Sequence, residues 1–346
     1  MTQLGVGKGN WSPGVLSPGQ AKSTVEYLVG LQLDNGMFPW YPGGHADPWN
    51  HCEVVIALAL YGEIEACEKG LAWLIDSQNR DGSFCHYYLT NGVEEPRRDL
   101  NTTAYLAVAF MSAFAGGLDE ATAKVMWPNV VSAIDYVVGY QFENGAFPWA
   151  VDPDGYVHQG SMLTGSSSIL SSLEAANILA DEFGEFRDSW REAEGRLRCA
   201  ISMKPELFLD KSEWAMDLYY PSLVGALDAR QAKRTLFRCI EDRLVVGWGV
   251  KCKSTSAWVT SAETSELAIA LQGNYLGDDA RRILAMTERF RDQDGSYFTG
   301  FAYEANRTFP GDERSSYSAA AVLIADSLIA LGLGGGLAGM LWSALA

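Results

Sequence analysis

The stretch Gln-Leu-Asp-Asn-Gly-Met-Phe-Pro-Trp at residues 32–40 decides the fold, because close copies of it return along the chain. Residues 141–149 read Gln-Phe-Glu-Asn-Gly-Ala-Phe-Pro-Trp, and residues 78–84 repeat its first part as Gln-Asn-Arg-Asp-Gly-Ser-Phe. An aromatic residue stands five positions before each Gln. A phrase that recurs at long intervals is typical of a repeat architecture.

Each copy of the phrase ends a helical pattern. Thr24–Leu31, Gly70–Ser77 and Val131–Tyr140 carry apolar residues at three- and four-residue spacing, which predicts helices. The Gly of the phrase favours a helix exit because it adopts left-handed backbone angles. We expect the Gln amide to satisfy backbone groups left open at helix ends, and the following aromatic residue to pack against the next helix.

The turns imply six pairs of helices. Recognisable turn glycines are Gly36, Gly82, Gly145, Gly247 and Gly295, at successive spacings of 46, 63, 102 and 48 residues. The spacing of 102 is about twice the others, which predicts one degenerate turn near Met203–Asp210. Six pairs close into an all-α (α/α)6 toroid, with one domain over residues 1–346, an N-terminal arm over 1–20 and a Gly- and Leu-rich tail over 332–346.

The second helix of each pair is the more apolar and is expected to form the inner ring, since a helix that is apolar nearly all round is buried. Val54–Leu60, Ala104–Ala113, Ile169–Ala180 and Ala319–Leu331 illustrate this. Strand signals are weak. The predicted pairs, first helix and then second, are 21–32 and 48–61, 66–78 and 99–114, 121–141 and 164–183, 187–201 and 214–227, 232–242 and 259–275, and 279–290 and 315–331.

The charge and cysteine content of the chain limit which classes of binding partner and which cellular compartment are expected. The net charge of −17 argues against binding to nucleic acid or to an anionic membrane surface. The six cysteines include no Cys-x-x-Cys pair, and with no signal peptide at the start they indicate free thiols and a cytoplasmic protein. The tail is too interrupted for a transmembrane helix, but peripheral membrane contact through it stays open. The sequence does not define an oligomeric state.

The repeated phrase resembles the QW-type repeat of terpenoid cyclases such as squalene–hopene cyclase, and the repeats of protein prenyltransferase β subunits. That resemblance implies a helical toroid with acid-initiated chemistry on an isoprenoid substrate. Residues 99–104, Asp-Leu-Asn-Thr-Thr-Ala, are similar to the cyclase signature Asp-x-Asp-Asp-Thr-Ala, in which the second Asp is the proton donor. Here that position is Asn101, and Asp99 alone retains an acid. The prenyltransferase zinc ligands have no match.

Candidate site residues lie where inner helices begin, because these turns rim one end of a toroid. Residues 45–53, His-Ala-Asp-Pro-Trp-Asn-His-Cys-Glu, are the densest set. Asp47 is either the N-cap of a helix that begins at Pro48 or, with His51 and Glu53, part of a ligand-binding cluster or a metal site. Asp99 is likewise an N-cap or a catalytic acid.

Two further carboxyl groups are candidates. Asp217 stands among Trp, Met and Tyr residues, where desolvation would raise its pKa and suit a general acid; the alternative is a structural role. Glu263 either completes a capping box with Thr260 or points into the central cavity. His86 and His158 are interpreted as turn residues. The predicted catalytic residues are Asp217, Asp99, Asp47 and Glu263, and the predicted substrate-binding residues are His51, Glu53, Trp49, Asn101, Tyr219, Tyr220, Trp258, Tyr317, Trp40 and Trp149.

Carboxylates among aromatic side chains fit two chemistries. The leading hypothesis is an isoprenoid cyclase or prenyltransferase-like enzyme, in which a buried acid protonates an olefin and aromatic faces stabilise a carbocation. The alternative is a carbohydrate-active toroid, a glycoside hydrolase or lyase, in which paired carboxylates flank a glycosidic bond. A non-catalytic ligand-binding toroid is the third reading. A small-molecule substrate is expected, and no cofactor.

Overall fold

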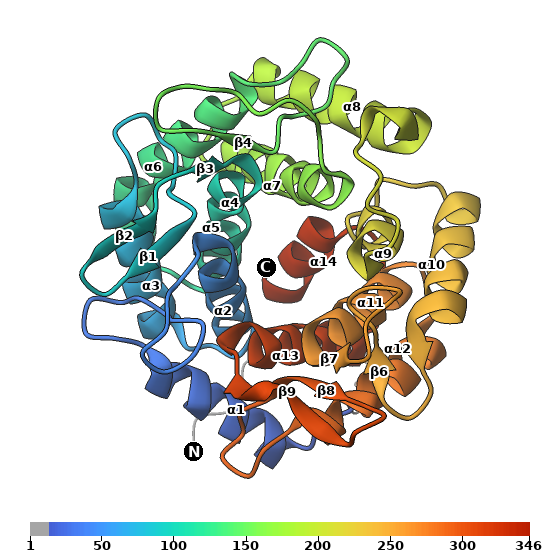
Figure 1. Ribbon diagram of the computed structural model, residues 1–346. Coiled ribbons are helices and arrows are strands. Elements are labelled where there is room, and N and C mark those ends of the chain that lie inside the picture. The colour runs from blue at the N-terminus through green and yellow to red at the C-terminus, as the bar shows by residue number, and fades with distance from the viewer. Residues whose placement is uncertain (1–13) are drawn as a thin grey trace.

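The computed structural model describes residues 14–346, which form two concentric rings of helices (Figure 1). Neighbouring inner helices contact one another all the way round, and the last contacts the first, so the ring is closed. The inner helices are α2 (Pro48–Leu60), α4 (Leu100–Ala104) with α5 (Leu106–Ala115), α7 (Leu163–Glu182), α9 (Ala215–Leu223), α11 (Ser261–Gly273) and α13 (Ser316–Leu331). The outer helices are α1 (Pro18–Leu31), α3 (Ile64–Ser77), α6 (Glu120–Val138), α8 (Asp188–Met203), α10 (Ala229–Arg243) and α12 (Gly277–Leu284), with short 3-10 helices at Pro205–Leu207 and Ala285–Phe290.

The Gln of the repeated phrase ties each turn to the outer helix of the next pair. Gln32 Nε2 donates to the carbonyl of Gly36 at 3.2 Å and to that of Ala66 in α3 at 2.9 Å. The same two bonds recur from Gln78 to Gly82 and Asn129, and from Gln141 to Gly145 and Ala193. The phrase therefore specifies how successive helix pairs stack.

A turn glycine also marks the closure of the ring. Gly295 has a φ of +88°, and a Cβ there would lie 2.4 Å from the backbone of Ser23 in α1. The last outer segment thus presses on the first helix, in a contact that only glycine permits. The predicted degenerate turn lies beyond α8, after the 3-10 helix Pro205–Leu207. There Asp210 Oδ1 accepts from the backbone N–H of Ser212 at 3.1 Å, as Asp81 does from Ser83. Lys211 replaces the glycine.

The expectation of an all-α chain is wrong in one respect, because loops that precede inner helices pair as short strands. Five of them form an antiparallel sheet in chain order: β5 (Leu244–Val245), β6 (Gly249–Val250), β7 (Val259–Thr260), β8 (Phe298–Ala302) and β9 (Arg307–Arg314). Two smaller pairs join β1 (Tyr87–Leu89) with β2 (Gly92–Glu95), and β3 (Arg98–Asp99) with β4 (Ala150–Val151). Strand pairing satisfies the backbone groups of these rim loops.

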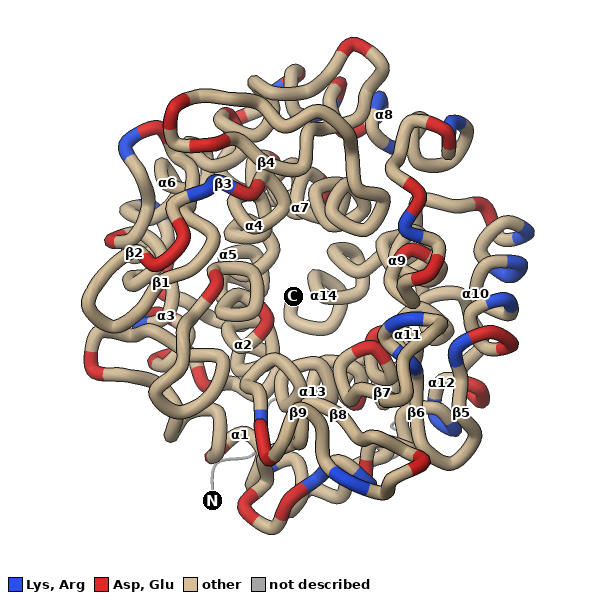
Figure 2. The backbone as a smooth tube through the Cα atoms, in the orientation of Figure 1, with Lys and Arg blue, Asp and Glu red and all other residues tan. Residues whose placement is uncertain are grey.

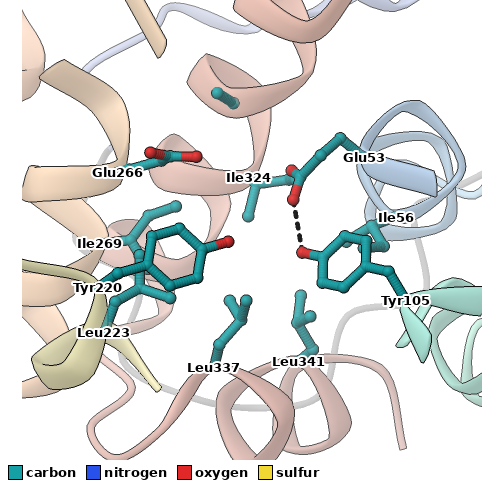
Figure 3. Close-up of a pocket in the computed structure, with 11 residues that line it drawn as sticks. Glu53, Ile56, Tyr105, Tyr220, Leu223, Glu266, Ile269, Ile324, Leu337 and Leu341 are labelled. Atoms are coloured by element: carbon teal, nitrogen blue, oxygen red, sulfur yellow. Dashed lines mark hydrogen bonds between the residues drawn. The ribbon is translucent and has the colours of Figure 1, made fainter. Parts of the chain in front are cut away.

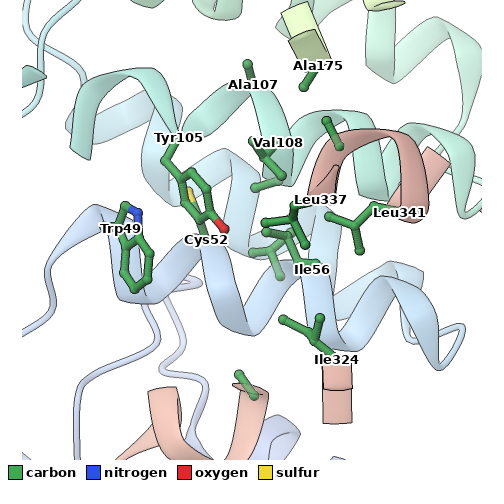
Figure 4. Packing of buried hydrophobic residues seen from close by; sticks show 14 of the residues in the cluster. Trp49, Cys52, Ile56, Tyr105, Ala107, Val108, Ala175, Ile324, Leu337 and Leu341 are labelled. Atoms are coloured by element: carbon green, nitrogen blue, oxygen red, sulfur yellow. The ribbon is translucent and has the colours of Figure 1, made fainter. Parts of the chain in front are cut away.

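The C-terminal segment lies inside the ring. Its helix α14 (Leu337–Leu345) contacts α2, α5, α7, α11 and α13 at one end of the central hollow (Figure 1). Leu337 and Leu341 point toward Ile56 and Ile324 of the inner helices (Figure 4). The helix carries no charged residue (Figure 2). These leucines belong to the core, so the structure gives no support to membrane contact through the tail.

Several smaller expectations can be compared with residues 14–346. The first residues of the predicted N-terminal arm lie outside this range, and its last residues are anchored where the backbone N–H groups of Val15 and Leu16 donate to Asp326 of α13. The six cysteines are all free thiols. Within the described part of the chain, no helix is long and apolar enough to span a bilayer.

Candidate active site

The starts of the inner helices enclose a cavity of about 740 Å³ at one end of the ring. The rim is built by the loops before α2, α4, α7, α9, α11 and α13, so residues far apart in sequence meet there. The predicted site residues that line this cavity are Asp47, Asp99, Glu263, Trp49, Asn101, Tyr220, Tyr317, Trp40 and Trp149.

Asp47 and Asp99 are helix N-caps, as one reading of each residue expected, and both also line the cavity. Asp47 Oδ1 accepts from the backbone N–H of Asn50 at 2.8 Å, and Asp99 Oδ1 accepts from that of Thr102 at 3.0 Å. Burial raises the pKa of both carboxyl groups, and the capping hydrogen bonds offset only part of this shift. Both side chains therefore favour the protonated form more than an exposed Asp does.

Glu263 lies in the first turn of α11 and is 8% exposed. Its carboxylate accepts a hydrogen bond from the Thr260 hydroxyl. The capping box is incomplete, because Thr260 makes no side-chain bond to the helix backbone. The Glu263 side chain lines the cavity, and the Thr260 hydroxyl orients it.

Aromatic side chains form the inner part of the cavity. The rings of Trp49 and Tyr105 stack at 5.0 Å between centroids, and Tyr317 meets Trp49 edge-on at 5.4 Å. Trp49 Nε1 donates to Ser168 Oγ at 3.1 Å, which joins α2 to α7 across the hollow. These contacts hold the aromatic faces in fixed orientations.

A second layer of acidic residues lies below the aromatic rings. Glu53, Glu266, Tyr105 and Tyr220 surround a void of about 10 Å³ that Leu337 and Leu341 of α14 close from the other side (Figure 3). Tyr105 donates to Glu53 Oε1 at 2.5 Å, and burial raises the pKa of Glu53 to about 7. The hydroxyls of Tyr219 and Tyr317 both donate to Glu266, whose pKa burial raises strongly.

Five predicted site residues are not in the cavity wall. His51 is buried, where its Nδ1 accepts from the N–H of Phe38 at 3.1 Å and its Nε2 lies 2.9 Å from the carbonyl of Gly70. Both ring nitrogens are thus used to hold the repeat turn, and burial lowers the pKa of His51 to about 3. The other four are Glu53 and Tyr219 in the layer below, Trp258, which stacks on Phe309, and Asp217.

Asp217 supports the cavity wall from behind. Thr164 Oγ1 donates to Asp217 Oδ1 at 2.6 Å, which connects α9 with the first turn of α7. Burial raises the pKa of Asp217, as expected, although Thr164 rather than Asp217 lines the cavity. The structural alternative for Asp217 accounts for this position.

Other cavity residues were not among the candidates. His45, His86, Tyr87 and Glu313 line the acidic side, and Met162, Met216 and Trp214 line another part. Two of them depend on rim hairpins: His86 precedes β1, and Glu313 on β9 accepts from Trp40 Nε1 at 3.0 Å. His86 lies in a bend, as the turn interpretation expected, and it also lines the cavity, which that interpretation did not predict. The only sequence signal for the cavity position of His86 was that it precedes the segment that begins at Asp99.

The cavity combines carboxyl groups in different environments with aromatic side chains of fixed orientation. Such carboxyl groups can act as acid and base, and the aromatic faces can stack on the flat faces of a polar substrate. Within residues 14–346, no group of three or more His, Cys, Asp or Glu side chains is arranged to hold a metal ion. The metal alternative for residues 45–53 has no support from their geometry, since His51 is bound within the core.

Comparison with solved structures shows that proteins of low sequence identity share this ring-shaped fold. A glycosidase variant in complex with glucose superimposes with a TM-score of 0.72 at 14% identity, over 90% of this chain and 96% of that one. A D-mannose isomerase gives a TM-score of 0.66 at 11% identity, over 89% and 97%. At these identities the likeness shows the fold alone. No protein-family model matches the chain.

A sequence relative defines the family. The chain is 37% identical over 318 residues to the MMP endo-(1,4)-3-O-methyl-α-D-mannosidase of Mycolicibacterium hassiacum, covering 91% of this chain and 88% of the relative. The chain belongs to the family of this glycosidase.

This relationship corrects the resemblance to terpenoid cyclases and prenyltransferases, which is wrong. The repeated phrase misled because its Gln bonds and turn glycines serve the stacking of helix pairs, a requirement that unrelated rings share. The Asp99 segment misled for a similar reason, since an Asp followed by Thr is also an ordinary helix N-cap. The carbohydrate alternative replaces the isoprenoid hypothesis.

Proposed function

We propose that this protein is an endo-acting glycosidase that hydrolyses α-(1,4) bonds between 3-O-methylmannose units, with Asp47 as general acid and Glu263 as general base. The observation that carries the proposal is one cavity lined by both carboxyl groups, in a chain 37% identical to a mannosidase of this specificity. Glycoside hydrolysis requires one carboxyl group to protonate the leaving oxygen and a second to activate water or attack the sugar.

Asp47 suits the general acid because burial raises its pKa. A raised pKa keeps a carboxyl group protonated until the leaving oxygen needs the proton. Its cap bond to Asn50 fixes the carboxyl group at the start of α2.

Glu263 suits the general base because of its place in the ring. One helix, α13, separates α11 from α2, whereas α4 with Asp99 stands on the opposite side of the ring from α11. Asp47 is therefore the nearer partner for Glu263 across a glycosidic bond. The Thr260 hydroxyl orients the Glu263 carboxylate.

Asp99 and Asn101 are proposed to bind sugar hydroxyls. Both line the cavity from the start of α4, and Asn101 Oδ1 has no hydrogen-bond partner within the described residues. A buried acceptor without a partner favours a donor from a ligand. Trp49, Trp149 and Tyr317 supply flat apolar faces for the carbon side of sugar rings.

The test is hydrolysis of a synthetic α-(1,4)-linked oligosaccharide of 3-O-methylmannose by wild type, Asp47→Asn and Glu263→Gln, with product lengths read by mass spectrometry. Wild type is expected to give internal fragments, and each variant to lose at least about a hundredfold in kcat. Asp34→Asn and Glu68→Gln change the same groups on exposed residues and serve as controls. Full activity of either cavity variant, or no cleavage by wild type, contradicts the proposal.

A further inference from the structure

The cavity has two chemically different walls. Asp47, Asp99, Glu263 and Glu313 bring carboxyl groups from α2, α4, α11 and β9. The adjacent helices α7 and α9 instead contribute two thioethers and a branched alkyl chain, from Met162, Met216 and Ile169. A wall without charge beside an acidic one divides the cavity into a reacting side and an apolar side.

Both methionines stand at fixed points of the rim. Met162 is the N-cap residue of α7, and Met216 lies in the first turn of α9. Both are half-buried, and Ile169 of α7 is 2% exposed. Methionine fills irregular gaps and adapts to small apolar groups.

Two neighbouring polar groups of this wall are already engaged within the protein. Thr164 donates to Asp217 at 2.6 Å, and Ser168 accepts from Trp49 at 3.1 Å. These bonds turn two hydroxyl groups toward protein partners. Ser166 adds a third hydroxyl to this wall, and the thioether side chains of Met162 and Met216 supply apolar surface beside it. A free sugar hydroxyl placed against them would lose its hydration without a hydrogen bond in return.

We infer that Met162 and Met216 form the subsite that recognises the O-methyl groups of the substrate and discriminates against unmethylated mannosides. The inference rests on the proposed function for the position of the sugar chain. It assigns to two residues the recognition of the 3-O-methyl group that the relative's name includes. One methyl group in an apolar pocket changes binding by roughly tenfold or more.

Binding tests the inference without dependence on turnover. Calorimetry on Glu263→Gln protein compares a tetrasaccharide of α-(1,4)-linked 3-O-methylmannose with the same tetrasaccharide of mannose. We expect the methylated ligand to bind about tenfold more tightly. Met162→Gln and Met216→Gln are then added, since they keep the side-chain length and introduce an amide. The affinity ratio of the two tetrasaccharides should fall close to one, and the affinity for the mannose tetrasaccharide should change little.

Two matched variants complete the design. Met162→Leu with Met216→Leu keeps the wall apolar and should retain the preference, which separates polarity from misfolding. Met203→Gln alters a methionine that is 74% exposed at the end of α8 and should change nothing.

Each failure has its own signature. The methyl subsite is overturned if the affinity ratio of the two tetrasaccharides is unchanged by the double Gln substitution. It is also overturned if both ligands bind equally before that substitution. Either result counts even if both sugars are cleaved. If the methylated ligand binds selectively but the protein with Glu263 intact cleaves neither sugar, the proposed function is contradicted and the methyl subsite is retained.

Discussion

The Tyr105 hydroxyl donates a 2.5 Å hydrogen bond to Glu53 Oε1, from the junction of α4 and α5 to the middle of α2 (Figure 3). Burial raises the pKa of Glu53 to about 7, and the hydrogen bond from Tyr105 lowers it only in part. An acid group with this pKa beneath the cavity couples the stability of the ring to pH near neutrality.

The first prediction follows from this pair. Because the pKa of Glu53 is higher in the folded than in the unfolded chain, its contribution to stability is present below pH 4.5 and is lost as the pH rises to about 7. The loss amounts to about 3 kcal/mol. Glu53→Gln removes this titration. As the pH rises through this interval, the free energy of unfolding of the variant should therefore increase relative to that of wild type. Urea denaturation at several pH values measures the difference, and Glu65→Gln, an exposed residue beside Lys69, should show none.

A second prediction concerns the turn glycines. Gly82 and Gly155 have nearly equal φ angles of +91° and +90°, but a Cβ on Gly82 would lie 2.2 Å from the carbonyl oxygen of Ser132, whereas Gly155 has open space. Gly155→Ala should cost about 1–2 kcal/mol for its backbone conformation alone. Gly82→Ala should cost about 2 kcal/mol more, because α6 must move. Thermal unfolding of the two variants gives the comparison, and equal losses would show that the turn is not pressed on the helix.

The third prediction tests α14 as part of the core. Leu341 is fully buried between α14 and the inner helices, so Leu341→Ala should lower the free energy of unfolding by about 2–5 kcal/mol. Leu89→Ala, at a site 37% exposed in β1, provides the matched change outside the core and should cost far less. Denaturant titration distinguishes them; a neutral Leu341→Ala would mean that α14 is dispensable for the fold.

A fourth prediction concerns stereochemistry. Axes of α2 and α11, with α13 between them, should lie about 15 Å apart if neighbouring helices pack at ordinary spacing. Carboxyl groups that reach inward from such positions leave room for a water molecule, the arrangement of an inverting glycosidase. Proton NMR of the first product should therefore show the β-anomer released from an α-linked substrate. Initial release of the α-anomer would indicate a covalent intermediate and a closer carboxyl pair.

The ring was predictable from sequence because its determinants are local and repeated. The Gln of the Gln-x3-Gly phrase donates hydrogen bonds within its own turn and to the next outer helix. The inner helices are apolar nearly all round, and this composition alone predicts that they are buried. The rim sheet was not predictable, since strands as short as Val259–Thr260 have too few residues to show alternation.

Part of the cavity lining was predictable from the starts of inner helices, although Asp217 at the start of α9 lies behind the wall, and the part that a hairpin carries was not predictable. Asp47, Asp99 and Glu263 follow from helix starts, whereas Glu313 reaches the cavity only through the pairing of β8 with β9. His51 shows the opposite error. Its neighbours in sequence line the cavity, but its helical phase turns it toward the repeat turn, where two backbone groups hold it.

The helix α14 has a consequence for how any polymer is handled. Because it fills the far end of the hollow, the ring is a cup and not a tunnel. A long chain can neither thread through it nor advance along it after a cut. On the proposed function, each scission begins with a new encounter at the open end of the cavity, and the fragments of a digest should appear in a distributive order instead of a processive ladder.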